Sequence, residues 1–297
     1  MSLSRGLTIL IQPRVHVMNV PVADLRYAKD IAIPIIDVVY TRYGGGSASV
    51  PGIIPLGDIH ADTGAMHALA ETTDLRTRVL LKAAFADGTL FGTIDKDEAT
   101  RTGFIAFRGT KSFTEWIDDV LFEPVTFSEV GAQAPRVHAG FHKVYLLARQ
   151  SLMDQLHLLS GIDRLIVTGH SLGAAVASLC ALDLAVHGGF HNLCCWTFAS
   201  PRTYFLSASA FNQKITQSLR VANPVDIVTH VPSIVQGYVH VTGGFDIDPK
   251  IEDFHSLDLT YAPGIAKKIG SMTAHAISLT GSEDEELRSM FQMATPS

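Results

Sequence analysis

A serine between two glycines stands at the junction of two apolar runs. The segment Gly169-His170-Ser171-Leu172-Gly173 follows residues 165–168, which are typical of a buried strand, and leads into residues 172–186, which are typical of a helix with almost no polar residue. A sharp strand-to-helix turn presents a serine hydroxyl for reaction, and small neighbours relieve the crowding. The first N–H groups of the helix and its positive dipole end then face a reacting carbonyl. The spacing therefore predicts that Ser171 is a nucleophile in acyl transfer.

The best candidate for a supporting acid is Asp226. A serine is a poor nucleophile unless a histidine takes its proton, and that histidine needs a carboxylate to hold its tautomer. With a serine in this kind of turn, the acid and then the histidine follow later in the chain. Asp226 lies just past the buried run 219–222, where ligands gather in open sheets. Asp246, Asp248 and Asp253 are rivals, and their pattern favours solvated loop charges.

Three histidines downstream of Asp226 compete for the role of base. His240 lies in a strand-like run over residues 238–242, His275 lies in an apolar helix-like run, and His255 follows an acidic loop. His230 is too close to Asp226 in sequence to be preferred. A histidine on a loop can reach in above the edge of a sheet, whereas strand and helix histidines more often pack in the core. We therefore predict that His255 is the base.

Further motifs form an ordered series between about residues 104 and 261. They are Phe107-Arg108-Gly109-Thr110, Trp116, Val137-His138-Ala139-Gly140-Phe141, Thr197-Phe198-Ala199-Ser200-Pro201-Arg202 and Asn223-Pro224-Val225-Asp226-Ile227-Val228. Together with the serine motif, this series resembles the class 3 lipases, the fungal triacylglycerol-lipase type of the α/β-hydrolase superfamily. The resemblance covers about half of the chain.

The resemblance implies an α/β-hydrolase fold, with a mainly parallel central sheet and helices on both faces. Asp226 matches the acid of the family and His255 the usual position of its histidine, while Thr110 matches an oxyanion-hole residue and Leu172 supplies the second N–H. The implied activity is hydrolysis of acylglycerol esters through an acyl-enzyme on Ser171, with no metal or organic cofactor. Phospholipase A1 activity, a soluble-substrate esterase and a non-catalytic lipase-like binding protein remain as alternatives.

The sequence departs from the family pattern at three points. Ala174 follows Gly173 where many members have another glycine, and Ala199 stands where a glycine is common. The interval between Asp226 and His255 is also short. The short interval bears directly on whether His255 reaches the acid.

Residues 111–121 have the pattern of an amphipathic helix directly after Thr110. Their apolar side chains recur at helical spacing and share one face, while charged and polar side chains cover the other. The apolar residues are Phe113, Trp116, Ile117, Val120 and Leu121. Because any movement of this segment exposes the expected oxyanion hole, we predict that it is a lid that opens on transient contact with a lipid interface. A surface helix that packs permanently on the core has the same periodicity and is the alternative.

The order of apolar runs predicts one α/β domain over residues 1–297, in which residues 1–57 form an N-terminal helix and a connector. A helix is predicted over residues 22–40, and residues 44–57 are rich in glycine and proline. A β-meander is predicted from strand-like runs at residues 79–85, 90–94 and 104–107. From residue 148 onward strands alternate with helices, with buried strands at 165–168, 193–198 and 219–222. Residues 282–293 predict an acidic helix at the end of the chain.

Composition narrows the partners and the location. Hydrophobic residues make up 47% of the chain and charged residues 18%, which suits a globular protein with a sizeable core. The formal net charge is -6 and the sequence has no Lys/Arg cluster, so we do not expect it to bind nucleic acid. The expected partner is a lipid or ester substrate. The three cysteines form no disulfide framework and residues 1–11 show no signal-peptide pattern, which together favour the cytoplasm over secretion.

Two other patterns are set aside. The apolar stretch 31–40 contains Pro34 and Asp37 and is far shorter than the roughly 20 residues of a membrane span, so we expect a buried helix and no transmembrane segment. Asp58, His60 and Asp62 alternate in the way that metal ligands on one strand face do. Further clustered ligands do not follow, and we expect a polar loop.

Overall fold

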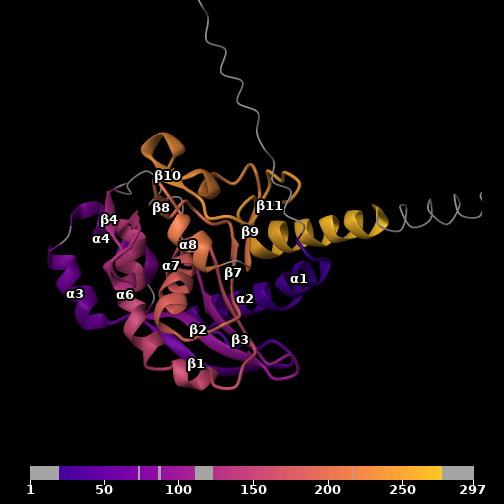
Figure 1. Ribbon diagram of the computed structural model, residues 1–297, viewed down its shortest axis with the longest axis horizontal. Coiled ribbons are helices and arrows are strands. Elements are labelled where there is room, and N and C mark those ends of the chain that lie inside the picture. The colour runs from indigo at the N-terminus through magenta and orange to yellow at the C-terminus, as the bar shows by residue number, and fades with distance from the viewer. Residues whose placement is uncertain (1–19, 73, 86–87, 111–122, 216, 276–297) are drawn as a thin grey trace, which may run out of the picture.

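The computed structural model describes residues 20–72, 74–85, 88–110, 123–215 and 217–275. Its centre is a seven-stranded sheet with the strand order β1-β2-β3-β6-β7-β9-β11 (Figure 1). The strands are β1 (Ile53–His60), β2 (Leu90–Asp97), β3 (Thr102–Phe107), β6 (Arg164–His170), β7 (Leu193–Phe198), β9 (Gln217–Ala222) and β11 (Gly244–Asp246). Neighbouring strands are parallel from β3 to β11, and β2 runs antiparallel to both β1 and β3.

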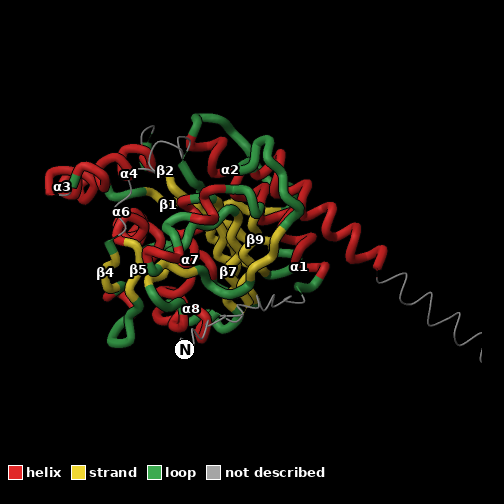
Figure 2. Tube along the Cα trace, turned by 90° about the horizontal axis from the view of Figure 1, so that it is seen from above, coloured by secondary structure: helices red, strands yellow, loops and turns green. Residues whose placement is uncertain are grey.

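Helices cover both faces of this sheet, and Figure 2 shows them on either side of the strands. The helices α4 (Leu75–Phe85), α6 (Ala139–Met153) and α7 (Leu172–His187) contribute to the hydrophobic core on one face. The other face packs against α1 (Val22–Tyr27), α2 (Ile33–Tyr43) and a helix over residues 262–275. This arrangement confirms the predicted α/β class with a mainly parallel sheet.

The helix α7 is buried along nearly all of its length, from Leu172 to Leu184. An apolar sequence on all sides of a helix suits burial between a sheet and other helices. The preceding strand β6 is central in the sheet, with β3 on one side and β7 on the other. The strand-to-helix turn at Ser171 therefore lies between a buried helix and a strand that has a neighbouring strand on each side.

The N-terminal helix is predicted correctly over residues 22–40, and its interior contains an irregular turn. Between α1 and α2 lies a π-helical turn, η1 (Ala28–Ala32), in which the N–H of Ile33 donates to the carbonyl of Ala28. Pro34 follows directly, and a proline lacks the N–H and clashes with the carbonyl four residues earlier. A wider turn before Pro34 accommodates its ring without ending the helix.

A second, smaller sheet has the order β10-β8-β5-β4. Its strands are β4 (Pro124–Thr126), β5 (Arg136–His138), β8 (Tyr204–Phe205) and β10 (Tyr238–Val239). The remaining elements are α3 (Thr63–Thr72), α8 (Ser209–Lys214) and the short helical turns η2 (Ser128–Val130), η3 (Leu156–Leu159), η4 (Ile227–His230), η5 (Ile234–Gln236) and η6 (Leu257–Tyr261). None of the helices in the described ranges is long and apolar enough to cross a bilayer.

Two local predictions are wrong. The predicted strand at 79–85 is part of helix α4, in which Leu80, Leu81, Ala84 and Phe85 are buried at helical spacing. The predicted connector at 51–57 instead enters strand β1, which lies at the edge of the sheet. An edge strand tolerates Pro55 because one of its sides has no strand to bond. For a short apolar run and for a run that contains proline, the surrounding packing decides which secondary structure forms.

Other predictions fall outside what the structure describes. The predicted lid over 111–121 and the acidic helix over 282–293 both lie outside the described residues. The single domain over residues 1–297 stays a prediction.

Candidate active site

Ser171 sits in a strained turn between β6 and α7. Its backbone has φ 59° and ψ -128°, a conformation that residues with a side chain seldom adopt. The flanking glycines are required by close packing: a Cβ on Gly169 would lie 2.3 Å from the carbonyl oxygen of Gly173, and one on Gly173 would lie 2.4 Å from the carbonyl oxygen of Arg108. Among the described residues, Ser171 Oγ has no hydrogen-bond partner. The turn thus presents a buried hydroxyl that is not committed to a structural bond.

The predicted acid and base are in contact. His255 Nδ1 lies 2.8 Å from Asp226 Oδ2, so the short interval between them is long enough to bring the two together. The same carboxylate oxygen accepts a bond of 2.8 Å from the phenol of Tyr261, and Asp226 Oδ1 accepts one of 3.0 Å from the N–H of Val228. The Asp226 side chain is fully buried and His255 keeps 21% of its side chain exposed. Asp226 is therefore fixed on both oxygens before it orients the imidazole.

Asn223 explains why the motif that carries Asp226 begins with an asparagine. Its side-chain amide donates to the carbonyls of Lys250 (2.7 Å) and Phe254 (2.9 Å), and its amide oxygen accepts from the N–H of Lys250 (3.2 Å). Asn223 follows the last residue of β9, so these bonds tie the loop before His255 to the end of a central strand. Asn223, which begins the loop that contains Asp226, therefore also fixes the position of His255.

His170, the residue before the nucleophile, holds His255 from the other side. Its Nε2 lies 2.9 Å from the main-chain carbonyl of His255, and its Nδ1 lies 2.9 Å from the hydroxyl of Tyr40. Burial, followed by the neighbouring charge of His255, lowers the pKa of His170 well below its usual value, so the ring is neutral. Because a carbonyl only accepts, the proton is on Nε2, and Nδ1 must accept from the Tyr40 hydroxyl.

Tyr40 extends this chain of hydrogen bonds to the loop after β3. Its oxygen accepts a 2.7 Å bond from the N–H of Gly109 while its proton goes to His170. A Cβ on Gly109 would lie 2.5 Å from the Tyr40 oxygen and 2.8 Å from Ser171 Cβ, so only glycine fits here. One helix of the N-terminal segment therefore fixes both the base and the loop beside the nucleophile.

Arg108 holds the same loop from within the protein. It is fully buried and donates from Nε to Leu90 O (2.8 Å) and from its two terminal nitrogens to Gly109 O (2.7 Å) and Ala84 O (2.7 Å). Its guanidinium also stacks over the ring of Tyr43, 3.3 Å from the ring centroid. The arginine of the Phe-Arg-Gly-Thr motif thus fixes the path of the chain into Thr110.

The two predicted oxyanion-hole residues flank Ser171. Thr110 is buried and directly follows Gly109, which packs against Ser171. Leu172 is the first residue of α7, where backbone N–H groups have no partner within the helix. The predicted lid residues Phe113, Trp116, Ile117, Val120 and Leu121 begin three positions later and lie outside the described residues.

The rival histidines are engaged elsewhere. His240 Nε2 lies 2.8 Å from the carbonyl of Thr229, and burial, with Arg220 nearby, lowers the pKa of His240 well below its usual value. His230 Nε2 lies 2.8 Å from the carbonyl of Pro224, and His275 is exposed at the end of the described residues. In the described part of the chain, no three His, Cys, Asp or Glu side chains are placed to hold a metal ion.

The fold and this site define the class of protein. A mainly parallel sheet has a central strand that ends in a strained serine turn, and a buried Asp paired with a partly exposed His follows later strands; this is the arrangement of an α/β-hydrolase. The family model described as Lipase (class 3) matches residues 104–236, so this segment is similar to the class 3 lipases.

Curated relatives agree with this family. The chain is 33% identical over 158 residues to a lipase of Rhizomucor miehei, covering 50% of this chain and 42% of that protein. It is 30% identical over 164 residues to the secreted mono- and diacylglycerol lipase A of Penicillium cyclopium, covering 53% of each. It is also 33% identical over 176 residues to phospholipase A1-II 4 of Oryza sativa subsp. japonica, covering 49% of this chain and 43% of that protein. The chain spans about half the length of the curated relatives it matches.

Solved structures share the fold. Lipase II from Rhizopus niveus superposes with a TM-score of 0.57 at 22% identity, covering 79% of this chain and 84% of that chain. A propeptide complex of Rhizomucor miehei lipase gives a TM-score of 0.56 at 22% identity, covering 76% and 67%. At this identity the likeness shows a common architecture.

The expected cytoplasmic location is wrong. One matched relative is named as a secreted mono- and diacylglycerol lipase, and this finding overturns the expectation. The absence of a disulfide framework carried the expectation, but a core of this size is stable without cross-links, so few cysteines do not exclude an extracellular enzyme.

Proposed function

We propose that the chain is a serine carboxylester hydrolase that cleaves acylglycerol esters, with Ser171 as nucleophile, His255 as base and Asp226 as acid. The observation that carries the proposal is the 2.8 Å contact between Asp226 and His255, held beside a serine in a strained turn. Structural histidines usually bond to the main chain, as His230 and His240 do here. A histidine that is paired with a buried carboxylate beside an uncommitted serine is instead arranged for proton transfer.

In the first half of the proposed reaction, His255 Nε2 takes the proton of Ser171 while the serine oxygen bonds to the ester carbonyl carbon. The carbonyl oxygen becomes negative and accepts bonds from the N–H groups of Thr110 and Leu172. Asp226 stabilises the imidazolium that forms. The proton then passes from His255 to the leaving alcohol oxygen, the C–O bond breaks and an acyl-enzyme remains on Ser171.

In the second half, His255 takes a proton from water, and the water oxygen attacks the acyl carbon. The tetrahedral oxyanion again bonds to Thr110 and Leu172, and Ser171 regains its proton as the fatty acid leaves. Two features support turnover in both halves: Tyr261 and Val228 hold the Asp226 carboxylate, and His170 holds the main chain of His255. The base therefore keeps its position while its charge changes.

Phospholipase A1 activity is the second candidate, since the rice relative with that name matches about as much of this chain as the fungal lipases do. Both reactions use the same attack on an ester carbonyl, so the residues that surround Ser171 do not distinguish them. The substrates differ at the far end of the glycerol, where a phospholipid has a phosphate ester in place of the third acyl chain of a triacylglycerol.

The apolar rim of the site supports contact with a lipid surface. Val225 and Ile227 flank Asp226 and are 43% and 49% exposed, and Leu259, four residues after His255, is 53% exposed. Exposed apolar side chains grouped at one site are typical of a surface that is buried on binding. The lid over residues 111–121 remains part of this proposal. Its opening predicts a step in the rate of a medium-chain ester at its solubility limit, and a weaker step in Trp116→Ser.

The central test is labelling with a fluorophosphonate, which reacts with the activated serine of such enzymes. We expect one label on Ser171, none in Ser171→Ala, and a loss of esterase activity on the order of 10⁶ in kcat for that variant. Purified protein is then assayed on a triacylglycerol emulsion, on diacyl phosphatidylcholine vesicles and on short p-nitrophenyl esters. Retention of wild-type turnover by folded Ser171→Ala overturns the proposal, and a preference for the vesicles favours phospholipase A1.

A further inference from the structure

Strand β2 carries a row of polar side chains on the face that α1 and α2 cover: Thr93, Asp95 and Asp97. Asp97 is fully paired, since its carboxylate accepts from the hydroxyl of Tyr27 (2.7 Å), from the hydroxyl of Thr100 (2.8 Å) and from the N–H of Ala99 (3.0 Å). It shows how a carboxylate under this helix is accommodated when the fold supplies its partners.

Asp95 lies two residues before Asp97 on the same face, and its hydrogen bonding differs from that of Asp97. Only 4% of the residue is exposed, and its Oδ2 has no hydrogen-bond partner among the described residues. The nearest cation is Arg42 on α2, but its guanidinium pairs with Asp58 of β1. A buried carboxylate oxygen without a partner costs free energy, so its retention points to a partner from outside the chain.

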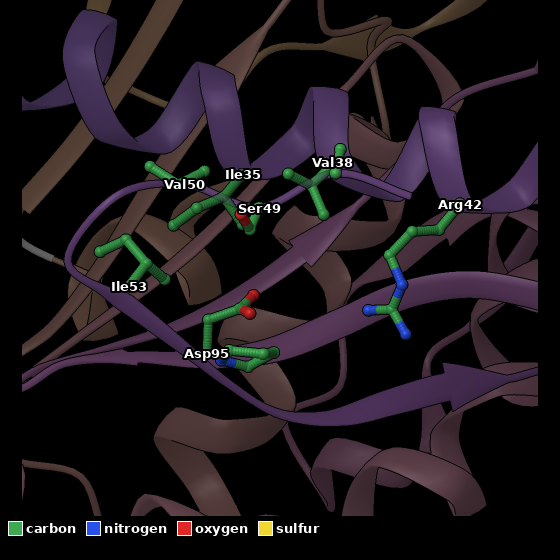
Figure 3. A pocket seen from close by; sticks show the side chains of 9 residues that line it. Ile35, Val38, Arg42, Ser49, Val50, Ile53 and Asp95 are labelled. Carbon is green, nitrogen blue, oxygen red and sulfur yellow. The ribbon is translucent and has the colours of Figure 1, made fainter. Parts of the chain in front are cut away.

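Asp95 lines a cavity between α2, β1, β2 and the loop after α2. Figure 3 shows the Asp95 carboxyl pointing from β2 toward Ile35 and Ser49. The cavity has a volume of about 190 Å³. Its apolar lining residues are Ile35, Val38, Ala48, Val50, Ile53 and Pro55, and its polar ones are Arg42, Ser49 and Asp95. The lining therefore combines one buried acid, one arginine and one hydroxyl with a mostly aliphatic wall.

The charges around the cavity favour a cation. From β1 comes Asp58, from α2 comes Arg42, which Asp58 neutralises, and β3 contributes no titratable side chain. Asp30 and Asp37 line an adjoining groove, where burial, followed by a hydrogen bond with Asp258, raises the pKa of Asp37 to about 8, so Asp30 supplies the negative charge there at neutral pH. An anion would meet a surplus of carboxylates, and an uncharged hydrocarbon would leave Asp95 Oδ2 without a partner.

We propose that this cavity is a binding site for a small primary ammonium ion with a compact apolar body, whose ammonium group pairs with Asp95. An apolar cavity of about 150 Å³ holds a benzene molecule, so the volume here suits about eight non-hydrogen atoms. Benzylammonium has this size: its ring fits the aliphatic wall and its three N–H donors reach Asp95 and Ser49. The site lies apart from Ser171 and does not depend on the function proposed for that residue.

The affinity of this cavity for an ammonium ion should depend on pH. Burial, with Asp58 nearby, raises the pKa of Asp95 to about 7, while Thr93 and Arg42 act in the opposite direction. Only the ionised carboxylate pairs with an ammonium, so binding is weak at pH 6 and strong at pH 8. The ionised fraction rises from about 0.1 to about 0.9 over this range, which predicts about tenfold tighter binding. Benzyl alcohol, the uncharged molecule of the same shape, gains nothing from this ionisation.

The test is a titration of the whole chain with benzylamine and with benzyl alcohol at pH 6 and pH 8, followed by calorimetry and by ligand-observed NMR. We expect saturable benzylamine binding that tightens about tenfold with pH, and weaker alcohol binding without that trend. Asp95→Asn keeps the shape of the cavity and removes a buried charge, so it is expected to fold and to bind benzylamine at least tenfold more weakly. Val38→Phe fills the cavity and is expected to abolish binding of both ligands.

Asp163→Asn is the matched control, because Asp163 is an exposed carboxylate paired with Arg101, and neither residue lines the cavity. It loses the same charge and should bind benzylamine as the wild type does. Equal benzylamine affinity in Asp95→Asn and the wild type overturns the proposal, as does binding that survives Val38→Phe. The absence of saturable binding up to tens of millimolar also overturns it, and water is then the partner of Asp95.

Discussion

The hydroxyl of Tyr40 offers a sharp test of how the N-terminal helix supports the site. Tyr40→Phe removes one oxygen and keeps the ring. That oxygen accepts from Gly109 N–H and donates to His170 Nδ1, at 2.7 and 2.9 Å. Its loss leaves one donor and one acceptor without their partner. The donor belongs to the loop that enters Thr110, and the acceptor to the ring that holds the main chain of His255.

The two effects have different magnitudes. Leaving a buried polar group unpaired costs about 1–3 kcal/mol, so the two groups together predict a loss of about 2–6 kcal/mol in the free energy of unfolding. Removing a whole oxyanion-hole donor costs about 10²–10³ in kcat. Tyr40 acts on the Thr110 N–H donor only through the Gly109 peptide, so we expect a smaller fall in kcat, about tenfold. We expect KM to change little, because Tyr40 does not contact the acyl chain.

Tyr27→Phe is the matched control on the same N-terminal helical segment. Its hydroxyl donates to Asp97 at 2.7 Å, and Asp97 keeps the bonds from Thr100 and Ala99. We expect this variant to lose about 1–2 kcal/mol and to keep its kcat. Urea unfolding measures the first quantity for both variants, and p-nitrophenyl ester kinetics well below the unfolding transition measure the second. If both variants lose stability but keep the wild-type kcat, the hydrogen-bond chain through Tyr40 has no part in catalysis.

Three further outcomes follow from the structure. His255→Ala should abolish ester hydrolysis, whereas His240→Ala should mainly lower the melting temperature, and the opposite pattern in kinetics and thermal melts refutes the choice of base. Gly173→Ala should cost about 3 kcal/mol or prevent folding, because its Cβ would lie 2.4 Å from a main-chain oxygen, while Gly270→Ala, with open space around it, should melt at or slightly above the wild-type temperature. Ile227→Ser should reduce activity on an emulsion several-fold and leave hydrolysis of a soluble short-chain ester unchanged, and an equal loss on both substrates argues against an interfacial role for this side chain.

The sequence determined the features whose causes are local. Buried parallel strands need continuous apolar runs, and the run 193–198 coincides with β7. The Gly-His-Ser-Leu-Gly segment predicted its turn because the crowding that requires glycine at position 169 arises within the turn itself, from the main chain of Gly173. The crowding at Gly173 comes from the distant main chain of Phe107 and Arg108. Its position just past a buried strand selected Asp226 among several carboxylates, and its position on a loop selected His255 among the downstream histidines. The structure places those two side chains in contact.

Tertiary structure decided what local patterns leave open. Residues 79–85 have an apolar run that suits a strand or a helix, and packing against α6 and the sheet selected the helix. Residues 53–60 form a strand only because β2 provides a partner for them. The partners of the site are also non-local: Tyr40 is 130 residues from His170, and Tyr261 is 35 residues from Asp226. A hydrogen bond between distant residues leaves no periodicity in either segment, because its energy depends on where the fold brings the two side chains and not on their neighbours in the chain.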